Sequence, residues 1–110
     1  MIEIKDLSEY MAHLMSKDHT DKLIIAYFTA TWCGPCKKIA PLMYEIDEQN
    51  ENIVVMKIDV DECEEVSAQC DIECMPTFLF YQNNEIEHFE KFSGADPQKL
   101  VTTINNILSE

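Results

Sequence analysis

Hydrophobic and polar positions alternate in blocks along the chain. Residues 23–28 and 53–58 are apolar on both faces, as expected for central strands that are covered by helices on each side. Three other blocks instead place their apolar side chains at helical spacing, namely 10–15, 39–46 and 100–108. Strand blocks and helix blocks therefore alternate along the chain.

Short polar signals mark the starts of two helices. Ser8 is predicted to cap the first helix. Asp96 followed by Pro97 is predicted to start the last one, because proline is tolerated in the first helical turn. Pro41 lies inside the second helix and predicts a kink there.

A β-hairpin is expected near the end of the chain. Residues 77–81 and 86–92 have strand character, and the four residues between them include two asparagines, which tolerate the left-handed backbone of a tight turn. A short edge strand at 2–4 and an acidic helix at 63–70 complete the order β-α-β-α-β-α-β-β-α. The sequence therefore predicts an α/β fold with a mixed central sheet of about five strands and helices on both faces.

Length and charge narrow the function classes. With 110 residues, the chain is expected to form one domain that spans 1–110. Its formal net charge is −13 and all eight of its cationic side chains are lysines, so binding to nucleic acid or to anionic membranes is not expected. The longest apolar run, 23–28, is far too short to span a membrane. The first residues are acidic where a secretory signal is basic, so we expect an intracellular protein.

Two of the five cysteines form a Cys-x-x-Cys motif where a buried strand ends and a helix begins. Cys33 is expected near the helix cap, where unpaired N–H groups and the helix dipole lower the pKa of a thiol. Cys36, one turn further in, is expected to be more shielded. Pro35 lacks an N–H that the first turn does not need, and Gly34 leaves room for a substrate chain to approach the sulfur. Attack by one thiol and resolution by the other are therefore geometrically possible.

Four segments of the chain resemble the thioredoxin family. They occur in the family's order across essentially the whole chain: Ala30–Lys37 (ATWCGPCK), Lys57–Asp61 (KIDVD), Met75–Phe78 (MPTF) and Phe92–Ala95 (FSGA). The further cysteines at 63, 70 and 74 are similar to the pattern of animal cytosolic thioredoxins. The resemblance implies a thioredoxin fold and a monomeric reductase of protein disulfides.

The resemblance also implies the reaction and its partners. The Cys33 thiolate attacks a substrate disulfide, and Cys36 then displaces the reduced substrate from the mixed disulfide and leaves a Cys33–Cys36 disulfide. No bound cofactor is implied, and the electrons are expected from NADPH through a flavoenzyme thioredoxin reductase. That reductase and disulfide-bearing proteins are the expected partners, in the cytoplasm, with a nuclear pool left open.

A substrate groove is a further implication of the resemblance. The family pattern implies a groove for extended peptide at four positions: Trp32, the backbone of Met75, a cis Pro76 and Gly94.

Two residues near the motif depart from the family pattern. Tyr27 stands where the family usually carries a buried aspartate that relays the proton of the resolving cysteine. Because tyrosine is a poor base at neutral pH, we hypothesise that deprotonation of Cys36 is slow and that the mixed disulfide is long-lived. Alternatively, a water or another carboxylate relays the proton and Tyr27 only packs. Lys57, which the family would pair with that aspartate, is expected to lose its proton, to reach outward or, as favoured here, to pair with Asp59.

The three remaining cysteines allow different interpretations. Cys63 and Cys70 lie seven residues apart on the expected acidic helix, about 10.5 Å along its axis, so they cannot form a disulfide while it is intact. They are either small apolar core residues or an oxidation switch that unwinds the helix. Cys74 directly precedes Met75 and is expected to border the groove, where it is either unreactive or a regulatory thiol that links two chains on oxidation.

Two rival functions remain at this point. Five thiols could supply a Cys₄ metal site, but the chain has one Cys-x-x-Cys pair, and the histidines at 13, 19 and 88 lack ligand spacing, so no metal is expected. The second rival is a thioredoxin-like module that binds partners and turns over slowly, for which Tyr27 is the motivating feature.

Overall fold

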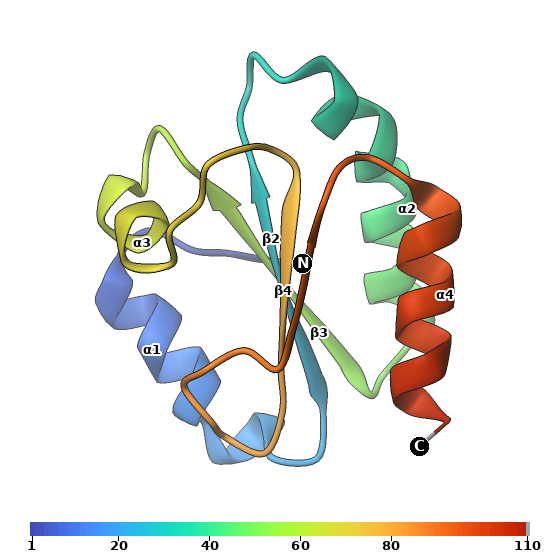
Figure 1. Cartoon of the computed structure of the whole chain (residues 1–110). Helices are drawn as coiled ribbons and strands as arrows, with labels where there is room; N and C mark the ends of the chain where they lie inside the picture. Colours follow the sequence, from blue (N-terminus) through green and yellow to red (C-terminus); the bar gives the residue numbers. More distant parts are fainter. Residues whose placement is uncertain (110) are drawn as a thin grey trace.

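The computed structural model describes residues 1–109 and shows one five-stranded sheet with helices on both faces (Figure 1). The strands are β1 (Ile2–Glu3), β2 (Leu23–Thr29), β3 (Ile53–Asp59), β4 (Thr77–Tyr81) and β5 (Glu90–Ser93). The helices are α1 (Leu7–Met15), the 3₁₀ helix η1 (Lys17–His19), α2 (Gly34–Gln49), α3 (Glu64–Gln69) and α4 (Pro97–Leu108). The predicted element order and fold class are confirmed.

The sheet is mixed because its connections differ. Its strand order is β1-β3-β2-β4-β5. The helical crossovers make β1 and β2 parallel to β3, whereas β4 is antiparallel to both β2 and β5. The central strand β2 therefore has a parallel neighbour on one side and an antiparallel neighbour on the other.

Side chains of β2 alternate between two hydrophobic cores, as the period of two in a strand requires. Ile24, Ala26 and Phe28 face α1 and α3, together with Tyr10 and Leu14 of α1. Ile25 and Tyr27 face α2 and α4 on the opposite side of the sheet (Figure 1). All seven residues of β2 are buried, which agrees with the apolar run in the sequence.

The start of α1 differs from the prediction. Asp6, not Ser8, is the N-cap: its backbone is extended, and its carboxylate accepts a hydrogen bond of 2.8 Å from the N–H of Glu9. Ser8 already lies inside the first turn of the helix. The predicted start of α4 is confirmed, because Asp96 accepts a hydrogen bond of 3.1 Å from the N–H of Lys99 and Pro97 follows it. A carboxylate on an extended residue thus caps both helices.

The hairpin is shorter than predicted. Asn83 and Asn84 adopt positive φ angles of 59° and 58°, as expected for its turn. The second strand, however, begins at Glu90 and not at Ile86. The side-chain amide of Asn84 donates hydrogen bonds of 3.2 and 2.8 Å to the carbonyls of Leu14 and Ser16, so this loop is attached to the end of α1 and leaves the sheet.

Two smaller features complete the fold. Helix α2 continues through Pro41, and α4 buries Leu100 and Ile104. Val101 and Leu108, which were expected on the same apolar stripe of α4, are instead 37% and 40% exposed. Among residues 1–109, no helix is both long and apolar enough to cross a membrane.

Candidate active site

The Cys-x-x-Cys motif lies at the amino end of α2, just beyond the carboxyl end of β2. Cys33 is the N-cap of α2, and the N–H of Cys36 donates a hydrogen bond of 3.1 Å to the Cys33 sulfur. A disulfide joins the two cysteines, whose Cα atoms are 5.3 Å apart. Both are buried, Cys36 more completely, with 1% of its surface exposed against 5% for Cys33. An anionic sulfur at Cys33 would face both an N–H donor and the positive end of the helix dipole.

The two residues between the cysteines suit a helix start that a substrate must approach. Pro35 occupies the first turn of α2, where its missing N–H leaves no hydrogen bond unmade. A Cβ added at Gly34 would meet no atom of this chain within 4 Å. The surface beside Cys33 is therefore open, and the space that Gly34 leaves is available to another molecule.

The loop before β4 covers the redox pair from the other side. The Met75 carbonyl oxygen lies 3.8 Å from the Cys33 sulfur, and the Met75–Pro76 peptide bond is cis, as the resemblance implied. Gly94, with a φ of +106°, donates a backbone hydrogen bond of 2.9 Å to the Pro76 carbonyl. Glycine suits this left-handed position. Three of the four expected groove residues are thus linked to one another next to Cys33, with Gly94 exposed, Met75 partly buried and Pro76 buried.

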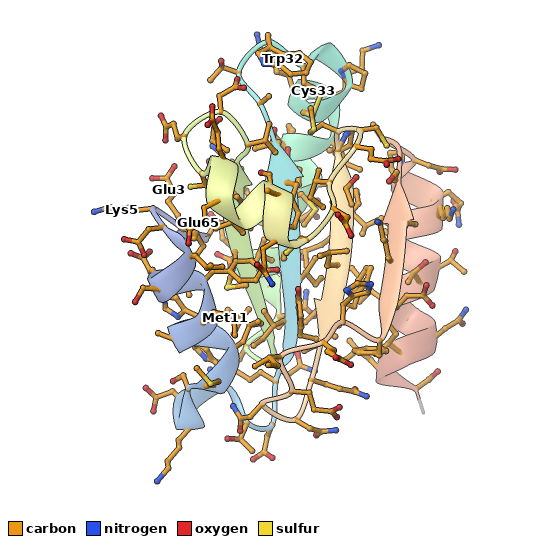
Figure 2. All side chains as sticks on the ribbon, turned by 60° about the vertical axis from the view of Figure 1, so that its left-hand side comes forward. Glu3, Lys5, Met11, Trp32, Cys33 and Glu65 are labelled. Atoms are coloured by element: carbon orange, nitrogen blue, oxygen red, sulfur yellow. A yellow bond between two sulfur atoms is a disulfide. The ribbon has the colours of Figure 1, made fainter. Side chains whose placement is uncertain are left out.

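Trp32 is the fourth groove residue and is held by a contact that sequence reasoning missed. Its side chain is 65% exposed, and its indole N–H donates a hydrogen bond of 2.7 Å to the carboxylate of Asp61. Figure 2 shows Trp32 and Cys33 at the same end of the molecule. The only sequence signal for this contact was the final aspartate of the KIDVD segment.

Tyr27 is fully buried beneath the motif. Its hydroxyl donates a hydrogen bond of 3.0 Å to the Cys36 carbonyl, and its ring stacks on Phe78 with centroids 5.5 Å apart. Burial raises the pKa of Tyr27 above its usual value. The phenol is therefore neutral near pH 7 and its proton is already bound to a carbonyl, so Tyr27 does not act as a base here.

The predicted pairing of Lys57 with Asp59 is wrong. The Lys57 ammonium reaches outward and lies 3.8 Å from the carboxylate of Glu3, which is its register partner on β1. Asp59 ends β3, and its Oδ1 accepts hydrogen bonds from the N–H groups of Asp61 (2.9 Å) and Glu62 (3.3 Å). The carboxylate of Asp59 therefore holds the turn after the strand.

Lys57 and Asp59 nevertheless share a cavity with the redox pair. This half-open cavity of about 340 Å³ lies behind the motif. It is lined by Tyr27, Thr29, Ala30, Thr31, Cys36, Lys37, Ala40, Lys57 and Asp59. The structure thus brings the thiol that was expected to resolve the mixed disulfide together with Tyr27, Lys57 and Asp59, three of the five residues, with Gly34 and Pro35, that were expected to tune the site.

The other cysteines differ in exposure. Cys63 and Cys70 are the two end caps of α3 and do not lie within it. Cys63 is buried, its thiol donates a hydrogen bond of 3.0 Å to the Ile4 carbonyl, and burial raises its pKa. Cys70 is half-buried with its sulfur 3.7 Å from the Tyr10 hydroxyl, and burial raises its pKa as well. Cys74 is exposed, next to the groove.

Native thiol labelling is expected to follow this order of exposure. With the Cys33–Cys36 disulfide intact, a small alkylating reagent should modify Cys74 first, Cys70 more slowly and Cys63 last, because the thiolate must be both formed and reached. Mass spectrometry of peptides over time measures the three rates. Labelling that spares Cys74 would remove the basis for a reactive thiol at the groove.

Histidine, cysteine and carboxylate side chains form no metal-binding cluster in the described part of the chain. Among residues 1–109, no group of three or more histidine, cysteine, aspartate or glutamate side chains could hold a metal ion. His13 and His19 do meet, with their ring nitrogens 3.4 Å apart, although the sequence spacing did not predict it. His88 packs edge-on against Tyr81, with ring centroids 6.2 Å apart.

Comparison with known proteins agrees with this geometry. The family model for thioredoxin matches residues 2–106. The chain is 44% identical over 108 residues to a thioredoxin of Ictalurus punctatus, covering 96% of this chain and 97% of that protein. It is 42% identical over 88 residues to a thioredoxin of Homo sapiens, covering 80% and 82% of the two chains. The crystal structure of Fasciola hepatica thioredoxin matches it with a TM-score of 0.88 and 31% identity, covering 96% of this chain and 98% of that chain.

A disulfide between two cysteines at the start of a helix, on a mixed five-stranded sheet, defines a thiol-disulfide oxidoreductase. The chain belongs to the thioredoxin family. Its fold is the thioredoxin fold, and its activity is reduction of protein disulfides by a redox-active cysteine pair.

Proposed function

We propose that Cys33 is the attacking nucleophile and Cys36 the resolving thiol of this reductase. The Cys33 thiolate attacks one sulfur of a substrate disulfide, and the other substrate sulfur leaves as a thiolate. Cys36 then attacks the Cys33 sulfur and releases the second substrate sulfur, so two electrons pass to the substrate and the chain becomes a disulfide. The observation that carries this assignment is that Cys33 caps α2 and receives the N–H of Cys36.

The groove defines the proposed substrates. Trp32, Met75, Pro76 and Gly94 border the face from which a substrate can reach Cys33, and Gly34 leaves that face open. An extended, disulfide-bearing segment of a protein suits this surface, because partly buried Met75 and exposed Gly94 offer backbone groups to the backbone of a peptide.

The proposed electron source is NADPH, through a flavoenzyme thioredoxin reductase that reduces the Cys33–Cys36 disulfide. Membership of the thioredoxin family supports this partner. No bound cofactor is needed, because the two sulfur atoms carry both electrons.

Coupled turnover tests the electron source. With NADPH, a thioredoxin reductase and a disulfide-bonded protein such as insulin, the chain should support continuous NADPH oxidation. Cys33→Ser should abolish it, and Cys63→Ser, a change at a buried thiol outside the Cys-x-x-Cys motif, serves as the matched control. If the chemically reduced chain reduces insulin but NADPH is not consumed, the proposed reductase is wrong.

One observation favours a second candidate, a specialised module that holds its partner. The Tyr27 hydroxyl is bound to the Cys36 carbonyl and so gives Cys36 no base. A mixed disulfide that persists for minutes at neutral pH would favour this candidate over rapid turnover.

We further propose the setting in which the chain works. Residues 1–110 form one thioredoxin domain that acts as a monomer in the cytoplasm, with a nuclear pool as the alternative address. Exposed Cys74 is the proposed site of a disulfide that links two chains on oxidation, because the other free thiols of residues 1–109 are more buried.

A further inference from the structure

Resolution of a mixed disulfide has a proton requirement that the motif alone does not meet. Cys36 must become a thiolate before it can attack, but its side chain is 1% exposed. Burial in apolar surroundings disfavours the charged form of a thiol. The hydroxyl of Tyr27, buried beneath the motif, already donates to the Cys36 carbonyl. A proton acceptor must therefore come from elsewhere.

The cavity behind the motif gives water access to Cys36. Its volume of about 340 Å³ is far above the roughly 10–15 Å³ that one water molecule needs. Hydroxyl, ammonium and carboxylate groups line it, so water in the cavity has hydrogen-bond partners. A chain of water molecules can thus join Cys36 to the polar end of the cavity.

Asp59 is the one carboxylate among the described residues that line this cavity. Both backbone hydrogen bonds that hold it, from Asp61 and Glu62, end on Oδ1. Oδ2 is therefore the oxygen that remains for water. The β2–β3 register aligns Asp59 with Thr29, two residues beyond Tyr27 in the direction of the motif.

Other charged groups around Asp59 favour negative charge in the cavity. Lys37 and Lys57 also line this cavity, and a positive charge near a thiol favours its thiolate form. A second hollow shares Lys57 and Asp59 with this cavity and is also lined by Glu3, Lys5 and Glu62. Asp59 thus borders both the cavity that contains the two lysines and a surface of mixed charge.

We propose that Asp59 accepts, through water in this cavity, the proton that Cys36 loses when it resolves the mixed disulfide. The Cys36 proton passes to water and a proton passes from water to Oδ2. The Cys36 sulfur then bonds to the Cys33 sulfur, the bond from Cys33 to the substrate breaks, and the substrate leaves as a thiolate that takes a proton from solvent. This inference rests on the proposed role of Cys36 and identifies Asp59 as a positioning residue for proton transfer.

The decisive variant is Asp59→Asn. The asparagine carbonyl can accept the same two backbone hydrogen bonds as Oδ1, so the turn after β3 is kept while the base is removed. The chemically reduced variant is mixed with excess protein disulfide, quenched with acid, and the Cys33 adduct is quantified by mass across pH. Formation of the adduct should be unchanged. Its decay near pH 7 should slow about tenfold or more, below the roughly 100- to 10,000-fold of a directly bonded base.

The pH profile separates a proton acceptor from a structural role. Decay in the Asp59→Asn variant should recover as pH rises, because solvent then removes the Cys36 proton, and Asp59→Glu should restore most of the rate at pH 7. A distorted turn would slow decay at every pH. Glu65→Gln is the matched control and removes the same charge. Glu65 is exposed on α3 (Figure 2) and is not among the residues that line the cavity.

Three outcomes would overturn the inference. Decay of the adduct in Asp59→Asn at the wild-type rate near pH 7 would exclude Asp59 as the acceptor. Equal slowing by Glu65→Gln would reduce the effect to net charge. Absence of a Cys33 adduct in the Cys36→Ser variant, which has no resolving thiol, would instead refute the proposed function, because adduct formation depends on Cys33 and adduct decay depends on Cys36 and Asp59.

Discussion

Replacing Cys36 with serine is expected to stop the reaction at the mixed disulfide. The Cys33 thiolate can still attack, because it remains the cap of α2, although a serine hydroxyl is not a nucleophile for a disulfide at neutral pH. Multiple-turnover reduction of insulin should fall at least about a thousandfold, as expected when a covalent step is removed. The variant should accumulate as one covalent adduct with its substrate, which intact-protein mass spectrometry detects.

Two further variants test which thiol carries the trapped adduct. Cys33→Ser should form no adduct, because the remaining thiol of the motif, Cys36, is the more buried of the two. Cys36→Ser combined with Cys74→Ser should form the adduct as efficiently as Cys36→Ser alone. Wild-type turnover in the single Cys36→Ser variant would contradict the assignment of Cys36 and would point to another thiol, such as exposed Cys74, as the resolver.

Replacing Tyr27 with alanine is expected to cost the fold about 3 to 5 kcal/mol, the usual range for removing a large buried ring. Tyr27 is fully buried, stacks on Phe78 and donates to the Cys36 carbonyl. Tyr27→Phe keeps the ring and should cost only about 1 kcal/mol for the lost hydrogen bond. Guanidinium unfolding of the oxidised chains near pH 7, followed by circular dichroism, measures both free energies of unfolding.

A second tyrosine provides the control for this series. Tyr44 lies on α2 with 46% of its surface exposed, and Tyr44→Ala should change the free energy of unfolding by less than about 1 kcal/mol. If Tyr27→Ala costs no more than Tyr44→Ala, the ring does not contribute the packing described here. If Tyr27→Phe costs as much as Tyr27→Ala, the hydrogen bond to Cys36 and not the ring is the main contribution.

Local patterns predicted most of the fold. Strands β2 and β3 follow from apolar runs that are too continuous for a half-exposed strand, and the start of α4 follows from Asp96 and Pro97. The residue that caps α1 could not be predicted from side-chain chemistry, because Asp6 and Ser8 both have side chains that can cap a helix. The backbone decided between them: Asp6 is extended, with φ −155°, and Ser8 is helical.

Contacts between distant segments explain the errors. Lys57 pairs with Glu3 because β1 lies beside β3, and no spacing within the KIDVD segment contains that information. Strand β5 starts late because Asn84 donates hydrogen bonds to the carbonyls of Leu14 and Ser16 at the end of α1. These two residues lie 70 and 68 positions before Asn84 in the chain. The tether from Trp32 to Asp61 crosses 29 positions.

The candidate site was predictable where its chemistry is local. The roles of the Cys-x-x-Cys residues could be predicted together because they start one helix. Each role depends on the residue's position at the cap or in the first turn of α2, from Cys33 to Cys36. The groove across from them was implied by family resemblance alone, since nothing near Met75 in the sequence indicates that its carbonyl lies beside Cys33. The cavity that joins Cys36 to Asp59 required the assembled sheet.

The approach of Met75 to Cys33 has a consequence for biosynthesis. The two residues are 42 positions apart, and the cysteine is made first. At roughly 5–20 residues per second, the ribosome adds the covering loop about 2 to 8 seconds after the motif. During that interval β4 is also missing, so β2 lacks its antiparallel neighbour. Each new chain therefore passes through a stage in which its cysteine pair has been made but the loop that packs beside Cys33 has not.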